Sequence, residues 1–224
     1  MADIWLIRHG QAGDLMGEYD LLSELGWAQS RRAGERWRHL GPVHHVITGA
    51  MRRHKETEIA FRETFGPMPA PTVDAAWNEF DHKAVIRAAR AADLQLDGSG
   101  RAAALGLFVR AMERWACGEH DADYPEPYLA FQGRVIAGLE RAAARLGRGE
   151  TALVFTSGGA ISAVCRHLME APPRAAFRLN TSLLNTSFTR IRVTGDLLNL
   201  ASVNVHSHFD DAPELIEPKR RRAR

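Results

Sequence analysis

The chain has 224 residues, 45% of them hydrophobic and 25% charged, which is enough to bury the core of one large domain. Its formal net charge is +2, but five cationic side chains stand between Lys219 and Arg224, so the rest of the chain carries −3. These values argue against a nucleic-acid-binding protein, no apolar run is long enough for a membrane span, and two cysteines, Cys117 and Cys165, make no disulfide framework or Cys-x-x-Cys site.

The first third of the chain predicts strands and helices in alternation. Residues 4–7, Ile-Trp-Leu-Ile, form a continuous apolar run that is typical of a strand buried on both faces. Ser23 is a candidate N-cap for the helix that follows. A second apolar run at 43–48 predicts another strand, 51–65 predicts a helix, and 73–77 predicts a further strand.

The middle of the chain differs in composition. Residues 82–92 and 101–118 are rich in Ala, Arg and Leu and predict helices, which we interpret as part of a helical cap insertion over about 82–130. A further helix is predicted at 132–146. The run at 151–156, Thr-Ala-Leu-Val-Phe-Thr, is the clearest buried strand of the chain.

The last third predicts a helix at 160–169 and two strands, 187–193 and 198–203, which a Thr-Gly-Asp turn joins as a hairpin. Strands that alternate with helices indicate an α/β fold with a mostly parallel sheet, formed by a single domain over residues 1–216. Residues 217–224 are predicted to be a basic flexible tail. The amino-terminal residues show no signal-peptide pattern, so a cytoplasmic protein is expected.

Two loops at the carboxyl ends of predicted strands carry residues suited to phosphate. Arg8 and His9 follow the first strand, and Ser157 and Gly158 follow the clearest one. A guanidinium binds phosphoryl oxygens as a fork, and a neutral imidazole can attack phosphorus or accept a proton near pH 7. Gly10 lets the backbone approach a bound anion. This edge of the sheet is therefore the candidate site.

The run Leu-Ile-Arg-His-Gly-Gln-Ala at 6–12 resembles the opening motif of the histidine phosphatase superfamily, which includes phosphoglycerate mutases. Further similarity lies in four later segments, so the resemblance covers nearly the whole chain. These segments are 22–29, 48–57, 77–81 and 204–208. In the second of them the family has Arg four residues before Thr, which selects Arg53 rather than Arg52. The third segment selects Glu79.

The resemblance implies a three-layer α/β/α sandwich and a two-step phosphatase mechanism. His9 would form a phosphohistidine, Arg8 and Arg53 would neutralise the phosphoryl oxygens, and Glu79 would act as general acid and then general base. The arginines supply the positive field, so neither a metal nor a cofactor is expected. The expected ligand is a phosphorylated small metabolite, a phosphoprotein or inorganic phosphate, with no nucleic acid and no membrane. The sequence leaves the oligomeric state, including a homodimer, open.

One position departs from the family pattern. The family has a second histidine in a Ser-His-Gly-Gly-like run, and Ser157 stands in its place here. A serine can donate a hydrogen bond, and the N–H groups of Gly158 and Gly159 at a helix N-terminus can add to it, but it supplies no imidazolium charge. A catalytically weak or inactive phosphate-binding protein is therefore the alternative. A mutase is less favoured, because the loop from Gly13 to Asp20 is short.

The remaining histidines of interest are expected to lie outside the chemistry. We interpret three of them as surface histidines or residues behind the site: His82, His206 and His208. Three others are interpreted as ordinary loop or helix-face residues: His44, His45 and His54. The substrate is not encoded in any motif, and specificity is expected to come from the insertion.

Overall fold

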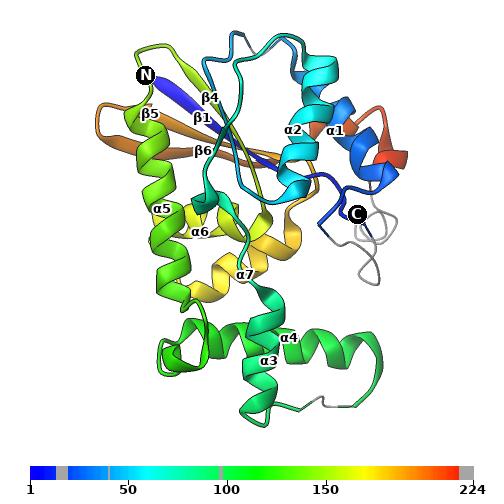
Figure 1. Cartoon of the computed structure of the whole chain (residues 1–224), viewed down its shortest axis with the longest axis vertical. Helices are drawn as coiled ribbons and strands as arrows, with labels where there is room; N and C mark the ends of the chain where they lie inside the picture. Colours follow the sequence, from blue (N-terminus) through cyan, green and yellow to red (C-terminus); the bar gives the residue numbers. More distant parts are fainter. Residues whose placement is uncertain (14–19, 40, 96–97, 217–224) are drawn as a thin grey trace.

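The structure is a computed structural model that describes residues 1–13, 20–39, 41–95 and 98–216. Within them, six strands form one sheet in the order β3-β2-β4-β1-β5-β6 (Figure 1). The strands are β1 Ala2–Arg8, β2 His45–Thr48, β3 Thr72–Val73, β4 Thr151–Thr156, β5 Phe188–Thr194 and β6 Leu197–Val205. β1, β2, β3 and β4 pair in parallel, whereas β5 runs antiparallel to both neighbours. The predicted α/β fold with a mostly parallel sheet is confirmed.

Helices cover both faces of the sheet, so the predicted three layers are present (Figure 1). The helices are α1 Glu24–Trp37, α2 Arg52–Phe65, α3 His82–Ala91, α4 Gly100–Ala116, α5 Tyr128–Ala144, α6 Gly158–Leu168 and α7 Pro173–Ser182. Short 3₁₀ turns are η1 Ala75–Trp77, η2 Asp121–Asp123, η3 Ser207–Phe209 and η4 Pro213–Leu215. α1 and α2 close one face, and α5 and α6 close the other.

The side chains of β1 show why its sequence is apolar without interruption. Ile4 and Leu6 join the core cluster that α5 and α6 close, whereas Trp5 and Ile7 join the cluster that α1 and α2 close. Successive strand residues point to opposite faces, so a strand covered on both sides needs an apolar residue at every position. β1 is therefore a central strand, and its carboxyl end is fixed firmly in the middle of the sheet.

The helices begin and end close to where the sequence places them. Ser23 caps α1 as predicted, because its Oγ accepts a hydrogen bond from the N–H of Gly26 at 3.1 Å. Where α1 crosses α2, Gly34 lies so near the carbonyl oxygen of Phe61 that a Cβ would overlap it. This close approach holds the two helices of that layer together.

Two local predictions are wrong. The strand expected at 73–77 is only Thr72–Val73, because Asp74 accepts the N–H of Ala76 and starts the turn η1 instead. Helix α7 was not predicted, since the two prolines at 172 and 173 indicated only the end of the preceding helix. In fact Pro173 begins α7, a position where proline is well tolerated.

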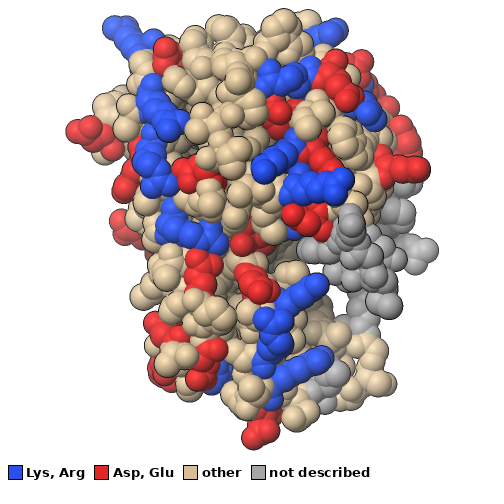
Figure 2. Space-filling model, viewed as in Figure 1, with Lys and Arg blue, Asp and Glu red and all other residues tan. Residues whose placement is uncertain are grey.

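The predicted hairpin of β5 and β6 is confirmed, and the region of the expected insertion contains α3, η2 and α4 at one end of the molecule (Figure 1). Most of the loop between Gly13 and Asp20 and the basic segment 217–224 lie outside the described residues. Basic and acidic side chains are interspersed over the face that Figure 2 shows. Among the described helices, none has the length and apolar character needed to cross a membrane.

Candidate active site

The parallel strands bring the candidate residues to one edge of the sheet. Arg8 ends β1 and His9 follows it, Arg53 lies in the first turn of α2 after β2, and Ser157 follows β4 at the start of α6. The carboxyl ends of parallel strands meet at the same edge, where open α/β sheets bind their ligands. Glu79, which follows η1, reaches the start of α6 from the side of β3.

His9 is buried, with 6% of its surface exposed, and its ring is held in one orientation. Its Nδ1 lies 2.7 Å from the carbonyl oxygen of Gly10. Because a carbonyl only accepts, Nδ1 carries the proton and Nε2 keeps its lone pair. Burial lowers the pKa of His9 well below its ordinary value, and the charges of Arg53 and Arg8 lower it further. His9 is therefore a neutral imidazole with a free nitrogen at neutral pH.

A single hydroxyl group links the His9 loop to α2. Thr57 Oγ1 donates to the carbonyl oxygen of Arg53 at 2.6 Å and accepts from the N–H of Gly10 at 3.0 Å. The first bond spans one helical turn, because its acceptor is the backbone carbonyl oxygen four residues before the threonine. Thr57 therefore ties the backbone of the His9 loop to the helical turn that carries Arg53.

Both site arginines are held by specific acceptors. Arg53 is 3% exposed, and its Nη1 donates to Oδ1 of Asp20 at 3.0 Å. The other oxygen of Asp20 accepts the N–H of Arg52 at 2.9 Å, which ties this acid to the start of α2. Arg8 donates through Nη1 to the carbonyl oxygen of Leu183. The two positive charges therefore have fixed positions beside His9.

Glu79 faces the N-terminus of α6. Its Oε2 accepts the N–H of Gly159 at 3.0 Å, and Oε1 accepts the N–H of Phe80 at 3.2 Å. Burial raises the pKa of Glu79 above its ordinary value, although these hydrogen bonds and the charges of Arg53 and Arg8 oppose the rise. A Cβ at position 159 would overlap Oε1, so any larger residue there would displace the carboxylate group of Glu79. Glu79 is thus placed to give and take a proton.

The structure corrects the interpretation of His54. It is fully buried on α2, and its Nε2 lies 2.6 Å from Oγ of Ser157, which is also fully buried. The expectation of an ordinary helix-face residue is wrong. These two residues are 103 positions apart, and no spacing rule in the sequence connects them. The only local signal is that His54 directly follows Arg53.

Helix α7 and the loop after it also reach the site. A Cβ at Gly158 would overlap Oδ1 of Asn180 and lie 3.4 Å from Nε of Arg8, so an amide of α7 stands beside the arginine. In the loop after α7, Asn185 donates through Nδ2 to the carbonyl oxygen of His9 at 3.0 Å. Sequence reasoning missed both asparagines, because α7 itself was missed.

Comparison with known proteins identifies the family of the chain. A family model described as the histidine phosphatase superfamily (branch 1) matches residues 4–206. The chain belongs to this superfamily. A search of curated proteins found no match.

Solved structures with the same fold include phosphatases and a mutase. YhfR of Bacillus stearothermophilus superposes with a TM-score of 0.67 at 20% identity, covering 93% of this chain and 99% of that one. A phosphoserine phosphatase variant of Entamoeba histolytica in complex with phosphoserine gives 0.65 at 17% identity and the same coverage. A phosphoglycerate mutase of Bacillus anthracis gives 0.64 at 17% identity, covering 93% and 95%. This chain shares the fold of these solved structures.

Two histidines near the end of this superfamily member are held by structural partners. His208 is fully buried between the rings of Phe188 and Phe209, with Nε2 at 3.0 Å from Oγ1 of Thr186, and burial lowers its pKa to about 3. The Nδ1 of His206 lies 2.6 Å from the carbonyl oxygen two residues before it. The contact of His208 ties η3 to the loop between α7 and β5, in which Thr186 lies.

His82 and Asn204 lie on different elements, α3 and β6. His82 is the first residue of α3 and is half-buried, and burial lowers its pKa. Asn204 has a left-handed backbone, with φ of 56°. Its Oδ1 accepts the N–H of Leu184 at 2.8 Å, and its Nδ2 donates to the carbonyl oxygen of Ser182 at 3.2 Å. Asn204 therefore anchors the loop between α7 and β5 to the hairpin.

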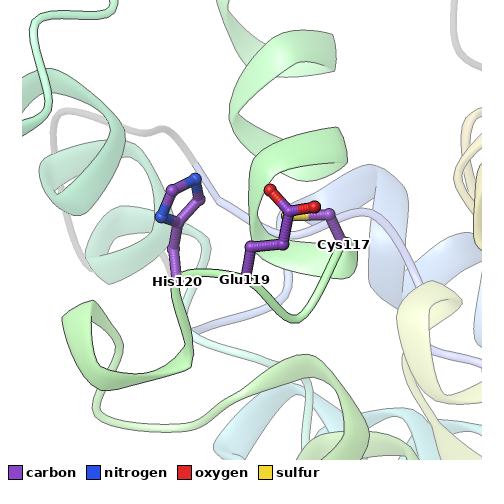
Figure 3. A group of neighbouring side chains, drawn as sticks. All are labelled: Cys117, Glu119 and His120. Carbon is purple, nitrogen blue, oxygen red and sulfur yellow. The ribbon is translucent and has the colours of Figure 1, made fainter.

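One group of potential metal ligands lies after α4 (Figure 3). Among the described residues, Cys117, Glu119 and His120 have ligand atoms within 4.8 Å of one another. All three are exposed, and the thiol of Cys117 donates to the carbonyl oxygen of Arg114 at 3.0 Å. The three residues lie in the short loop between α4 and η2, and we assign them no function.

Proposed function

We propose that this superfamily member is a phosphatase that hydrolyses a phosphomonoester of a small metabolite or phosphoprotein through a phosphohistidine at His9. The observation that carries the proposal is the state of His9. Its Nδ1–H is held by the carbonyl oxygen of Gly10, which leaves the lone pair on Nε2, and its pKa is depressed beside two buried or half-buried arginines, Arg8 and Arg53. A neutral, oriented imidazole in a positive field is what attack on a phosphoryl dianion requires.

In the first step, Nε2 of His9 attacks phosphorus and the ester P–O bond breaks. The charge on the equatorial oxygens is neutralised by Arg8 and Arg53. The leaving oxygen takes the proton of the Glu79 carboxyl group and departs as an alcohol. The raised pKa of Glu79 supports this role, because it keeps the carboxyl group protonated to higher pH.

In the second step, the carboxylate of Glu79 takes a proton from water as the water oxygen attacks phosphorus. The N–P bond breaks, its electron pair returns to Nε2 of His9, and inorganic phosphate leaves. Glu79 is again protonated, so the cycle closes with one water consumed. The substrate, one water and the side chains of His9 and Glu79 balance the two steps.

An apolar pocket beside the site supports a role for the helical insertion in specificity. Its lining includes Phe80, Trp115 of α4 and Phe131, and it extends to Gly159 and Asn180. Because Trp115 belongs to the region 82–130, we propose that this region contacts the part of the substrate that carries no phosphate. The complex of the Entamoeba phosphatase with phosphoserine shows that the fold accommodates a small phosphorylated metabolite.

The second candidate is a protein that binds phosphate with little or no turnover. The uncharged Ser157 favours it, because losing one oriented donor to a transition state costs about 10²–10³-fold in kcat. This candidate predicts binding of phosphate without a phosphorylated intermediate.

Release of p-nitrophenol from p-nitrophenyl phosphate tests the choice. We expect turnover by the wild type, loss of turnover in His9→Ala, and no change in His120→Ala, which alters an exposed histidine. Rapid acid-free quenching with labelled substrate should trap a base-stable, acid-labile phosphoryl group that His9→Ala lacks. Equal rates in wild type and His9→Ala would contradict the proposal.

A further inference from the structure

A buried hydrogen bond joins the two sides of the phosphoryl site. His54 is carried by α2, directly after Arg53, whereas Ser157 follows β4. Nε2 of the first lies 2.6 Å from Oγ of the second, and neither side chain is exposed. A short bond in a dry environment is electrostatically strong, so it fixes both side chains.

The hydroxyl group of Ser157 is not used by the helix that it precedes. Ser157 is the N-cap residue of α6, with φ of −113° and ψ of 165°, but its side chain makes no capping hydrogen bond. Serine at this position usually accepts an N–H of the first turn. Here the N–H of Gly159 goes to Glu79 instead. The direction of the hydroxyl group is therefore set by His54.

The backbone leaves room for this imidazole at one place. A Cβ at Gly49 would overlap Nδ1 of His54 and lie 2.8 Å from its Cε1. The position of Gly49 is itself fixed, because its N–H donates to the carbonyl oxygen of Phe155 at 3.0 Å. The absence of a side chain at Gly49 is thus a packing requirement of the ring.

The hydrogen-bond inventory selects the tautomer of His54. Among the described residues, its Nδ1 is buried and has no hydrogen-bond partner. A buried N–H without an acceptor is rarer and costlier than an unused lone pair, so the proton belongs on Nε2. Nε2–H then donates to Oγ of Ser157. The hydroxyl proton of Ser157 is left to donate elsewhere, and its oxygen is polarised by the imidazole.

We propose that His54 and Ser157 act as one unit in which His54 orients and polarises Ser157, and the hydroxyl group of Ser157 donates a hydrogen bond to the phosphoryl group bound at His9. The inference rests on the proposed phosphoryl-binding role of the site. The rings of His54 and His9 are 5.8 Å apart between centroids, so the imidazole lies beside the nucleophile. His54 is the positioning residue, and it brings an imidazole to this side of the site from α2 rather than from the position after β4.

Vanadate binding is the first test, because it requires no turnover. Calorimetric titration compares wild type with Ser157→Ala, His54→Ala and the double variant. Each single variant should bind vanadate about 10- to 100-fold more weakly. The double variant should bind no more weakly than the worse single variant, because each single substitution already removes the contribution of the pair. Multiplied losses in the double variant, or wild-type affinity in Ser157→Ala, would overturn the proposal.

An exchange of the two residues is the second test. His54→Ala combined with Ser157→His returns an imidazole from the other side, and should recover vanadate affinity to within about 10-fold of wild type. A purely structural His54 predicts no recovery above His54→Ala, and that result would overturn the proposal. Ser157→Ala keeps the test valid if His54→Ala does not fold, because the hydroxyl group does not cap α6.

The two proposals fail in different ways. If wild type binds vanadate but does not hydrolyse p-nitrophenyl phosphate, the phosphatase proposal fails and the affinities still decide the role of His54 and Ser157. If wild type binds no vanadate, both proposals are overturned.

Discussion

Replacing Thr57 with valine is expected to detach the His9 loop from α2 while the shape of the side chain is conserved. The substitution removes the bond donated to the carbonyl oxygen of Arg53 at 2.6 Å and the bond accepted from the N–H of Gly10 at 3.0 Å. Gly10 is buried, so its N–H loses its acceptor without gaining water. One unpaired buried donor costs about 1–3 kcal/mol of the free energy of unfolding.

The loss of activity should exceed what this destabilisation explains. Without the hydroxyl group, the backbone that holds His9 is free to move relative to Arg53, and a displacement of about 1 Å can cost about 10²-fold in rate. We therefore expect kcat/KM for p-nitrophenyl phosphate to fall about 10- to 100-fold in Thr57→Val. Urea unfolding, measured in parallel, shows how much of the protein is folded under the assay conditions.

The same helix offers a matched control. Thr64 donates through Oγ1 to the carbonyl oxygen of Arg31 at 2.6 Å, and this bond joins α2 to α1 instead of to the site. Thr64→Val should lower stability and leave kcat/KM of the folded protein unchanged. If Thr57→Val loses no more activity than Thr64→Val, the hydroxyl group does not couple the loop to Arg53.

Three further outcomes are expected. The kcat/KM should rise with pH while His9 loses its proton, because the pKa of His9 lies well below the ordinary 6.5. It should fall at higher pH as the carboxyl group of Glu79, whose pKa is raised above the ordinary 4.5, loses its proton. Glu79→Gln should lack this fall, and a wild-type rate that still climbs above pH 7 would contradict the assignment. Unfolded His208 takes up a proton below pH 6.5, whereas folded His208 does so only near pH 3. The free energy of unfolding of wild type, measured with urea, should therefore fall by about 2–3 kcal/mol more between pH 7 and pH 4.5 than that of His208→Gln. His120→Gln should match wild type. Gly159→Ala should displace Glu79 and lower kcat/KM of the folded protein about 10²-fold, and an unchanged rate would refute the contact.

Much of the fold follows from local patterns in the sequence. The continuous apolar runs predict β1 and β4 because a strand covered on both faces has no polar side, and the turn at Gly195 predicts the hairpin of β5 and β6. Helix α7 was missed because a proline can end one helix and begin the next, and only packing distinguishes the two. The strand expected at 73–77 was shortened by a capping bond of Asp74.

Contacts between segments that are distant in the sequence could not be predicted from local patterns. The burial of His54 and its bond to Ser157 depend on how α2 lies against the loop after β4, and no periodicity within either segment encodes that distance. Asn180 likewise reaches Gly158 only because α7 packs against α6. A local pattern reports the face on which a side chain lies, and the partner on the other side comes from another part of the chain.

The sequence by itself indicated that Arg8, His9, Arg53 and Glu79 belong to the candidate site. Arg8 ends a central strand and His9 follows it, and Arg53 lies one helical turn before Thr57, whose hydroxyl group binds the His9 loop. Only the tertiary structure decided the charge states of these groups and the pairing of His54 with Ser157. The physical reason is that proton affinity and hydrogen-bond partners depend on the desolvation and neighbouring charges that packing creates from distant segments.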